Sequence, residues 1–337
     1  MIPFDYVRAA SMDDALQAGA EPGVRFLAGG TNLIDLMKEM VERPRRVVDL
    51  GRLGLDQIEP LAEGGLRLGA LAANADTAYH PDVERGYPLL ASAILAGASP
   101  QLRNAATNGG NLNQRTRCLY FYDVATPCNK REPGSGCGAI GGVTRNNAIL
   151  GTSEACIATH PSDMCVALAA LDATVQVVSS GGARSIAFSD YHRLPGDQPE
   201  KDNTLQPGEI VTSIDLPAEQ FRDNYSYLKL RDRLSYAFAL VSVAAALSLK
   251  DGRISDARVA LGGVAHKPWR RRDAEQTLIG GEATPEAFAA FAKRLLEGAV
   301  GHGGNDFKIE LAERAIVRAL TQAANGTPQS QSHKKIA

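Results

Sequence analysis

The residues of this chain best suited to chemistry are its five cysteines, because thiolates bind metal ions and iron–sulfur clusters. All five lie in one stretch of the 337-residue chain: Cys118, Cys128, Cys137, Cys156 and Cys165. No two of them have the two-to-four-residue separation typical of structural zinc sites. Four separated ligands on a glycine-rich loop fit a larger, cubane-like cluster better. Buried thiols without a ligand remain open, as do disulfides, which are less favoured without a secretory signal.

Charge within the cysteine-containing stretch also favours ligand binding. Residues 114–145 carry five basic side chains against two acidic ones, Asp123 and Glu132, a net charge of +3. This positive field would compensate thiolates and predicts lowered thiol pKa values. Cys165 differs, because it follows Ser162 and Asp163, a natural helix N-cap, and opens an apolar run. We therefore expect Cys165 in the core rather than among the ligands.

Two glycine pairs form a second candidate site. The segment LAGGTNLIDL (27–36) has the pattern of a strand, a glycine pair and a helix start, and ATNGGNL (106–112) repeats it. Backbone amides at a helix start attract anions, so the two loops together predict a diphosphate held from both sides. Neither has the Rossmann or P-loop spacing, and each could be a simple turn.

Three single residues have both a functional and a structural interpretation. Asp163 could accept hydrogen bonds from a ribose or ring nitrogen, or could serve only as a helix cap. Lys229 could lie near an electron-rich ring, although a solvated strand residue is the simpler interpretation, and His160 needs no function. No nucleophile–base pair and no H-E-x-x-H motif are found. Redox chemistry would therefore belong to cofactors.

Composition excludes two classes of partner. The net charge of −2 provides no positive excess for a nucleic-acid backbone. The longest apolar run, 237–249, is too short and is interrupted by Ser242 and Ser248, so we expect no membrane span. The first residues lack a basic segment followed by an apolar one, and from its own sequence the chain is expected in the cytoplasm.

Capping, apolar spacing and turn residues predict mixed helices and strands. Ser11 with Asp14 predicts a helix start, and Asp251-Gly252 predicts a hairpin between strands 237–249 and 254–261. Residues 114–155 show no sustained periodicity, which is typical of a functional or disordered segment. The remaining expected strands are 24–27, 46–50, 65–71, 174–179 and 209–216, and the expected helices are 31–41, 87–95, 164–171, 271–279, 285–299 and 307–323.

Four motifs in this order carry a resemblance to a known family. They are LAGGTNLIDLMK (27–38), ATNGGNLNQRTRC (106–118), CIATHPSDMCVALAALDA (156–173) and KLRDRLSYAFALVSVAAAL (229–247). Together they resemble the FAD-binding medium subunit of the molybdenum hydroxylases, the family of xanthine dehydrogenase and carbon monoxide dehydrogenase. The cysteine loop is similar to that of the flavin subunit of periplasmic aromatic aldehyde oxidoreductase and, more loosely, of 4-hydroxybenzoyl-CoA reductase.

The resemblance implies an α+β fold. Residues 1–57 and 58–220 would form the two parts of an FAD-binding domain of the vanillyl-alcohol-oxidase (PCMH) type, with a cluster loop at about 114–156. Residues 221–325 would form a C-terminal α+β domain, followed by a disordered tail at 326–337.

The resemblance also implies the binding residues and no catalytic side chain. A 4Fe–4S cluster would be held by Cys118, Cys128, Cys137 and Cys156. FAD would lie extended between the two parts of its domain, with its diphosphate held by backbone amides and by the side chains of Thr31, Asn32 and Thr107. The implied FAD contacts are Leu27, Ala28, Gly29, Gly30, Thr31, Asn32, Leu33, Ile34, Thr107, Gly109, Gly110, Asn111, Asp163, Ile210 and Lys229.

The implied function is that of an electron-transfer subunit in a heterotrimeric aldehyde oxidoreductase. A large subunit would hold the molybdenum cofactor, a small subunit would hold 2Fe–2S clusters, and this chain would pass electrons to an external acceptor. A partner's twin-arginine signal could carry the folded complex to the periplasm. Two alternatives remain: a stand-alone flavin oxidase of the same fold, and a non-redox scaffold whose cysteines bind zinc.

Overall fold

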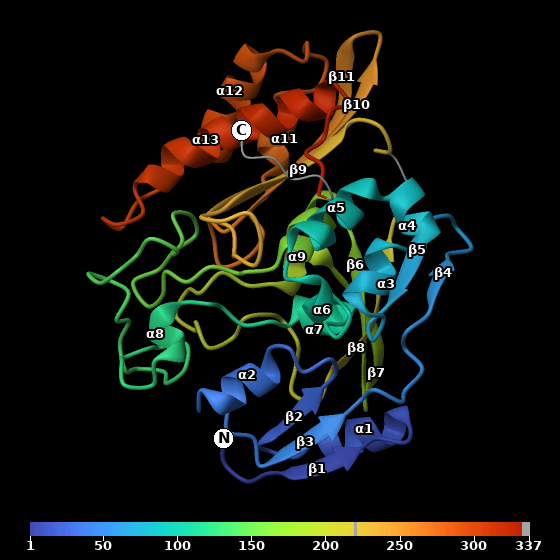
Figure 1. Ribbon diagram of the computed structural model, residues 1–337, viewed down its shortest axis with the longest axis vertical. Coiled ribbons are helices and arrows are strands. Elements are labelled where there is room, and N and C mark those ends of the chain that lie inside the picture. Colours follow the sequence, from blue (N-terminus) through green and yellow to red (C-terminus); the bar gives the residue numbers. More distant parts are fainter. Residues whose placement is uncertain (219–220, 332–337) are drawn as a thin grey trace.

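The N-terminal sheet is parallel, because a helix joins each strand to the next. The computed structural model describes residues 1–218 and 221–331. The sheet has the order β1-β3-β2, and all its pairs are parallel. Its elements, in chain order, are β1 (Asp5–Arg8), α1 (Met12–Gly19), β2 (Val24–Leu27), α2 (Leu33–Lys38) and β3 (Arg46–Asp49) (Figure 1).

Local chemistry sets the starts of the first two helices. Ser11 Oγ accepts a hydrogen bond from the Asp14 amide at 3.1 Å, so the predicted cap of α1 is confirmed. The helix expected from Thr31 begins instead at Leu33. Gly30 has a φ of +72°, a left-handed conformation that glycine adopts readily, and it delays the start of α2.

The central sheet is antiparallel and has the order β4-β5-β8-β6-β7. Its strands are β4 (Ile58–Pro60), β5 (Leu66–Gly69), β6 (Thr174–Ser179), β7 (Gly182–Ala187) and β8 (Ile210–Leu216). The associated helices are α3 (Asn74–Ala78), α4 (Pro81–Gly86), α5 (Pro88–Ala96), α6 (Pro100–Arg103), α7 (Asn108–Leu112), α9 (Asp163–Ala170) and α10 (Phe188–Tyr191). The expected strands and the helices at 87–95 and 164–171 are confirmed; the short elements β4, β7, α3, α4, α6, α7 and α10 were not predicted.

The C-terminal sheet is a three-stranded antiparallel meander covered by helices. Its elements are β9 (Tyr225–Leu230), β10 (Val241–Lys250), β11 (Arg253–Gly262), α11 (Arg272–Glu275), α12 (Pro285–Leu295) and α13 (Phe307–Ala324). The predicted hairpin is confirmed: Asp251 and Gly252 both have positive φ, +51° and +76°, as this two-residue turn requires. β10 starts at Val241 rather than at the predicted Ala237.

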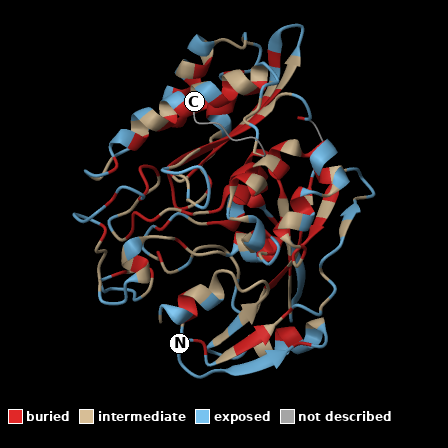
Figure 2. Ribbon diagram, viewed as in Figure 1, coloured by how far each residue is buried: buried red, intermediate tan, exposed pale blue. Residues whose placement is uncertain are grey.

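Helices pack on both faces of this sheet. Along β10, Ala244 and Ala246 belong to the core that contains α5 and α9, whereas Val243 and Ala245 belong to the core beneath α12 and α13. Successive side chains of a strand point to opposite faces, so with both faces covered β10 is apolar at every position from Val243 to Leu247. Figure 2 shows the buried residues gathered along this sheet and on α5 and α9.

The cysteine-containing segment is the least regular part of the chain. Between residues 114 and 156 it forms one short helix, α8 (Leu119–Tyr122), and otherwise loops, as its lack of periodicity predicts (Figure 1). Phe121 and Cys128 pack against Leu36 of α2 in a small separate core. The segment is therefore folded against the N-terminal part of the chain.

The end of the chain is only partly described. Gly326, with a φ of +60°, closes α13, and residues 326–331 form no helix or strand. The rest of the predicted disordered tail, 332–337, lies outside the described residues. Within the described ranges, no helix combines the length and apolar character needed to cross a membrane.

Candidate functional site

A cleft of about 1750 Å³ brings together residues that are far apart in the sequence. Its walls come from the β2–α2 region, from the segments around α7 and α9, from the loop before β8, and from the end of β9. Ile34 is exposed on α2 and is not part of the lining. The lining includes Leu27, Ala28, Gly29, Gly30, Thr31, Asn32, Leu33, Thr107, Gly109, Gly110, Asn111, Asp163, Ile210 and Lys229.

The first glycine loop presents unpaired donors to the cleft. The backbone amides of residues 29–32 make no hydrogen bond within the described chain. Asn32 Oδ1 accepts from the Arg115 amide at 2.9 Å, whereas Asn32 Nδ2 is buried without a partner. A run of free backbone amides beside a free carboxamide nitrogen is a binding site for an anion.

Gly29 allows the loop to approach the neighbouring backbone. A Cβ on Gly29 would lie 1.8 Å from the carbonyl oxygen of Ala105, a backbone atom that no side-chain rotation can move. The first loop therefore packs directly on the chain just before the second glycine loop. This contact holds the two glycine loops at the same cleft.

The second glycine loop differs from the first, because its amides already have protein partners. The Asn108 and Gly109 amides donate to Ala72 and Ala70 carbonyls at 3.0 and 2.7 Å, and the Gly110 amide donates to Thr107 Oγ1 at 3.2 Å. The Asn111 carboxamide is held as well, donating to Asn74 Oδ1 at 2.7 Å. This loop therefore lines the cleft without a set of free donors, and its glycines fit closely against Ala70 and Thr107.

Asp163 and Lys229 form a buried ion pair in the cleft wall. Lys229 Nζ lies 2.7 Å from Asp163 Oδ2, and Tyr227 donates to the other carboxylate oxygen at 2.7 Å. Lys229 Nζ also donates to the Ala96 carbonyl at 3.2 Å. The simpler interpretation of Lys229 as a solvated residue is wrong, because β9 lies against α5 and its consecutive side chains from Ser226 to Lys229 are all buried. The helix cap is Ser162, not Asp163.

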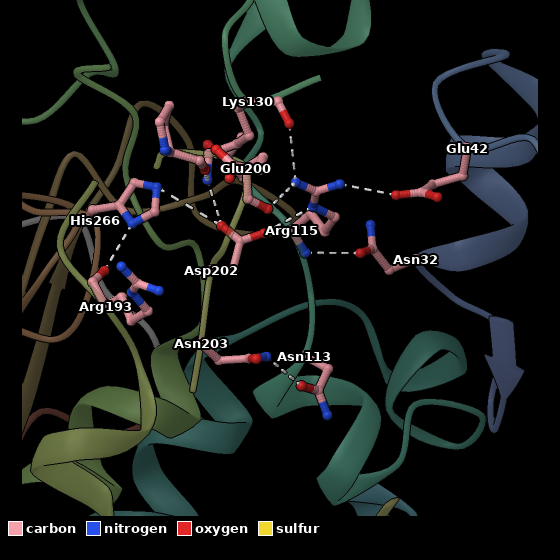
Figure 3. Close-up of polar contacts among 12 residues, drawn as sticks. Asn32, Glu42, Asn113, Arg115, Lys130, Arg193, Glu200, Asp202, Asn203 and His266 are labelled. Carbon is pink, nitrogen blue, oxygen red and sulfur yellow. Dashed lines mark hydrogen bonds and ion pairs between the residues drawn. The ribbon is translucent and has the colours of Figure 1, made fainter. Parts of the chain in front are cut away.

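A charged network that the sequence did not indicate crosses one side of the cleft. Arg115 donates to Asp202 at 2.8 Å and to Glu42 at 2.9 Å, so it bridges the loop after α2 and the segment before β8 (Figure 3). Lys130 is buried and also donates to Asp202. Burial by itself raises the pKa of Asp202, but the neighbouring Lys130, Arg115 and His266 outweigh burial and lower this pKa below its ordinary value. These residues are up to 160 positions apart, and no local pattern connects them.

The four predicted cluster ligands lie on neighbouring parts of the loop segment. All five cysteines are free, and Cys128 and Cys137 face each other in an isolated antiparallel bridge. Cys118 Sγ accepts from Asn147 Nδ2 at 3.6 Å, and Cys156 Sγ accepts from the Ala158 amide at 3.4 Å. Within the described chain, no three of these four cysteines form a group that could hold a metal ion. As they lie, the four thiols therefore do not form a zinc site.

The expectation of lowered thiol pKa values is wrong for two of these cysteines. Burial raises the pKa of Cys118, and it raises the pKa of Cys156 to about 12 despite the nearby Lys130. The basic residues of the segment are engaged elsewhere: Arg115 with Glu42 and Asp202, Lys130 with Asp202, Arg117 with Asp35, and Arg145 with Asp232. Their charge ties the segment to the rest of the protein more than it acts on the sulfurs.

Comparison with known proteins identifies the family. Residues 2–219 match the family described as the FAD-binding domain in molybdopterin dehydrogenase, and residues 225–323 match the CO dehydrogenase flavoprotein C-terminal domain. The chain belongs to the FAD-binding medium subunits of the molybdenum hydroxylase family. The predicted family and its α+β organisation, an FAD-binding domain followed by a C-terminal domain, are thereby confirmed.

Individual members of the molybdenum hydroxylase family match nearly the whole chain. The aldehyde oxidoreductase FAD-binding subunit PaoB of Escherichia coli (strain K12) is 49% identical over 96% of this chain and 99% of its own length. The glyceraldehyde dehydrogenase medium chain of Sulfolobus acidocaldarius is 29% identical over 95% of this chain and 96% of its own length. Among solved structures, quinoline 2-oxidoreductase from Pseudomonas putida 86 matches with a TM-score of 0.74 and 26% identity over 97% of this chain and 98% of that one.

Proposed function

We propose that this chain is the FAD-binding subunit of a heterotrimeric, molybdenum-dependent aldehyde oxidoreductase. Its partners would be a small subunit with 2Fe–2S clusters and a large subunit with the molybdenum cofactor. The similarity to PaoB, named as an aldehyde oxidoreductase subunit, and to a glyceraldehyde dehydrogenase medium chain supports an aldehyde as the substrate of the complex. The aldehyde would react on the large subunit, because no nucleophile–base pair is found in this sequence.

The open donors of the first glycine loop are the observation that carries FAD binding. The free amides of residues 29–32 and the unpaired Asn32 Nδ2 would hold the diphosphate, with Gly109 and Gly110 of α7 lining the same cleft. Bound FAD supplies a group that accepts electrons singly and releases them in pairs. The protein's own contribution is placement: Arg115 orients Asn32 through its backbone amide, and the Asp163–Lys229 pair stays charge-balanced in the wall.

We further propose that Cys118, Cys128, Cys137 and Cys156 hold a 4Fe–4S cluster. Four free thiols and the N–H donors at two of the sulfurs support this assignment, because such donors stabilise cluster-bound thiolates. The wide separation of the four cysteines along the sequence also favours a cluster over zinc. A cluster supplies storage for a single electron. The Arg117–Asp35 pair, at 3.0 Å, connects the segment next to Cys118 with α2, which begins at the FAD loop.

The same proposal includes the domain boundaries, at residues 57, 220 and 325, and the cellular compartment of the protein. Assembly with cofactors would take place in the cytoplasm, and export, where it occurs, would follow a twin-arginine signal on a partner. Cell fractionation of a tagged chain, with and without the partner subunits, tests the compartment.

Purification of a tagged chain from its native host tests the function. We expect two companion polypeptides, a flavin spectrum with a broad iron–sulfur shoulder, and about four iron atoms bound by the isolated chain. Aldehyde should reduce the flavin in the complex but not in the isolated chain. Flavin reduction by the isolated chain would indicate a stand-alone oxidase, and a colourless, zinc-containing chain would indicate a scaffold. Either result would contradict the proposal.

A further inference from the structure

A second group of metal-ligating side chains lies in the core, apart from the four cysteines of the loop segment. It consists of His160, just before α9, Cys165 on α9, and His192, just after α10. A ring nitrogen of each histidine and the Cys165 sulfur all lie within 4.8 Å of one another. The exposed fractions of the three residues are 8%, 0% and 3%. Two imidazoles and a thiol that converge in the buried core require a physical explanation.

The two histidines each have a buried nitrogen without a partner. His192 Nε2 lies 2.9 Å from the Leu112 carbonyl, so Nε2 carries the proton and Nδ1 carries a free lone pair. His192 Nδ1 and His160 Nε2 are both buried with no hydrogen-bond partner. Buried polar atoms are almost always satisfied by protein, water or a metal ion. A histidine that ligates a metal typically donates its other N–H to a carbonyl, as His192 does.

The spacing fits a metal ion better than a direct hydrogen bond. Within the described chain, no hydrogen bond joins the Cys165 thiol to either ring. The ring centroids lie 4.3 Å apart with planes tilted by 49°, so the rings are in contact without stacking face to face. Metal bonds of about 2.0–2.3 Å to nitrogen and sulfur would bring the donor atoms to roughly 3.5–3.8 Å. Side-chain shifts of at most about 1 Å would close the triangle around an ion.

We propose that His160, Cys165 and His192 bind one metal ion with a filled d shell, Cu⁺ or Zn²⁺. Thiolate and imidazole are the ligands that these ions share. Binding would form one metal–sulfur and two metal–nitrogen bonds and release the thiol proton of Cys165 to solvent. Cu⁺ with one thiolate leaves the buried site neutral, whereas Zn²⁺ leaves one positive charge, so burial favours Cu⁺. With no fourth ligand among these residues, three-coordinate geometry is expected.

The ion would hold separate segments of the chain together beside the FAD cleft. Cys165 lies two residues after Asp163 in α9, and the Leu112 carbonyl that orients His192 ends α7, which carries the second glycine loop. Binding would therefore join α9, the segment before it and the end of α10, and would hold α7 through His192. The expected result is a more stable cleft wall, with no part in electron transfer required.

Anomalous diffraction from crystals of the full, cofactor-containing wild-type chain tests the site directly. Crystals of protein incubated with one equivalent of Cu⁺ under anaerobic conditions, or of Zn²⁺, are measured above and below the matching absorption edge. We expect a peak between the three side chains with at least one of the two ions. Ordered water there, with metal found only at the four loop cysteines, would overturn the proposal.

Metal analysis of variants provides the second test. Cys165→Ala and His160→Gln should each lose one copper or zinc ion per chain, and the rise in melting temperature that the ion produces, while iron content stays constant. His302→Gln is the matched control, since His302 Nε2 is also buried without a partner but is not part of the triangle. Equal metal content in all four proteins would refute the site.

Discussion

Replacing Gly29 by alanine isolates the role of the first glycine loop. The added Cβ would lie 1.8 Å from the Ala105 carbonyl oxygen and 2.7 Å from its carbon, and real Cβ contacts are essentially never below 3.0 Å. The two backbones must therefore separate by about 3.0 − 1.8 = 1.2 Å. We expect a shift of this size to lengthen or misalign at least two hydrogen bonds between the loop amides and the phosphates. At about 1.5–3 kcal/mol for each charge-assisted bond, the loss is about 3–6 kcal/mol, or roughly 10²- to 10⁴-fold in the Kd for FAD.

Flavin fluorescence quenching with the FAD-free protein measures this Kd, and circular dichroism checks that the variant is folded. Gly181→Ala is the matched control, because its Cβ would lie 3.5 Å from Ser179 Oγ, an ordinary contact, in a turn that does not line the cleft. Gly30→Val should also weaken FAD binding, since Gly30 has a φ of +72° that a β-branched residue adopts only under strain. A folded Gly29→Ala protein that binds FAD within threefold of the wild type would refute the assignment of the diphosphate to this loop.

Three further predictions concern the buried charges and the cysteines. Lys229→Met should lower the free energy of unfolding by about 3–5 kcal/mol, because it leaves Asp163 buried without its cation, and Asp163→Asn in the same chain should restore part of the loss in chemical denaturation. Cys137→Ser should lose iron whereas Cys165→Ser should keep it, as measured by metal analysis; the opposite pattern would contradict the ligand assignment. Burial lowers the pKa of Lys308 to about 7, whereas the ordinary lysine pKa is near 10.5. Between these two pH values the unfolded chain binds more protons than the folded chain, so the free energy of unfolding should rise with pH. In the Lys308→Met variant, the free energy of unfolding should rise by about 1.4 kcal/mol less per pH unit than in the wild type. If the free energies of unfolding of the two proteins change in parallel with pH, this prediction is contradicted.

Local elements of the fold could be predicted because their chemistry is local. The Ser11 cap needs only the Asp14 amide three residues away, and the Asp251-Gly252 turn needs only two residues that tolerate positive φ. The cysteine-containing segment was also recognisable, since its lack of periodicity and its cysteines lie in one stretch. The short helices around the cleft were not, because helices of four to six residues depend on tertiary contacts more than on propensity.

Some parts of the candidate site depend on residues that are distant in the sequence, and these parts could be recognised only in the folded structure. The sequence predicts Lys229 as a solvated strand residue, but in the structure β9 lies against α5 and Asp163 pairs with Lys229. The positive residues near the cysteines were expected to lower thiol pKa values, yet Arg115 and Lys130 pair with Asp202 instead. Each error concerns a side chain whose partner lies more than sixty residues away, a separation that a local pattern cannot encode.

The order of residue types along the chain was enough to identify a glycine loop built for an anion, a four-cysteine segment and the family to which both belong. Tertiary structure decided which of those groups are free to bind. Only folding pairs the amides of the second glycine loop with Ala70 and Ala72 while leaving those of residues 29–32 open, and only folding brings His160 and His192 to Cys165. The physical reason is that a donor's availability depends on every neighbour that could satisfy it, and most of those neighbours come from elsewhere in the chain.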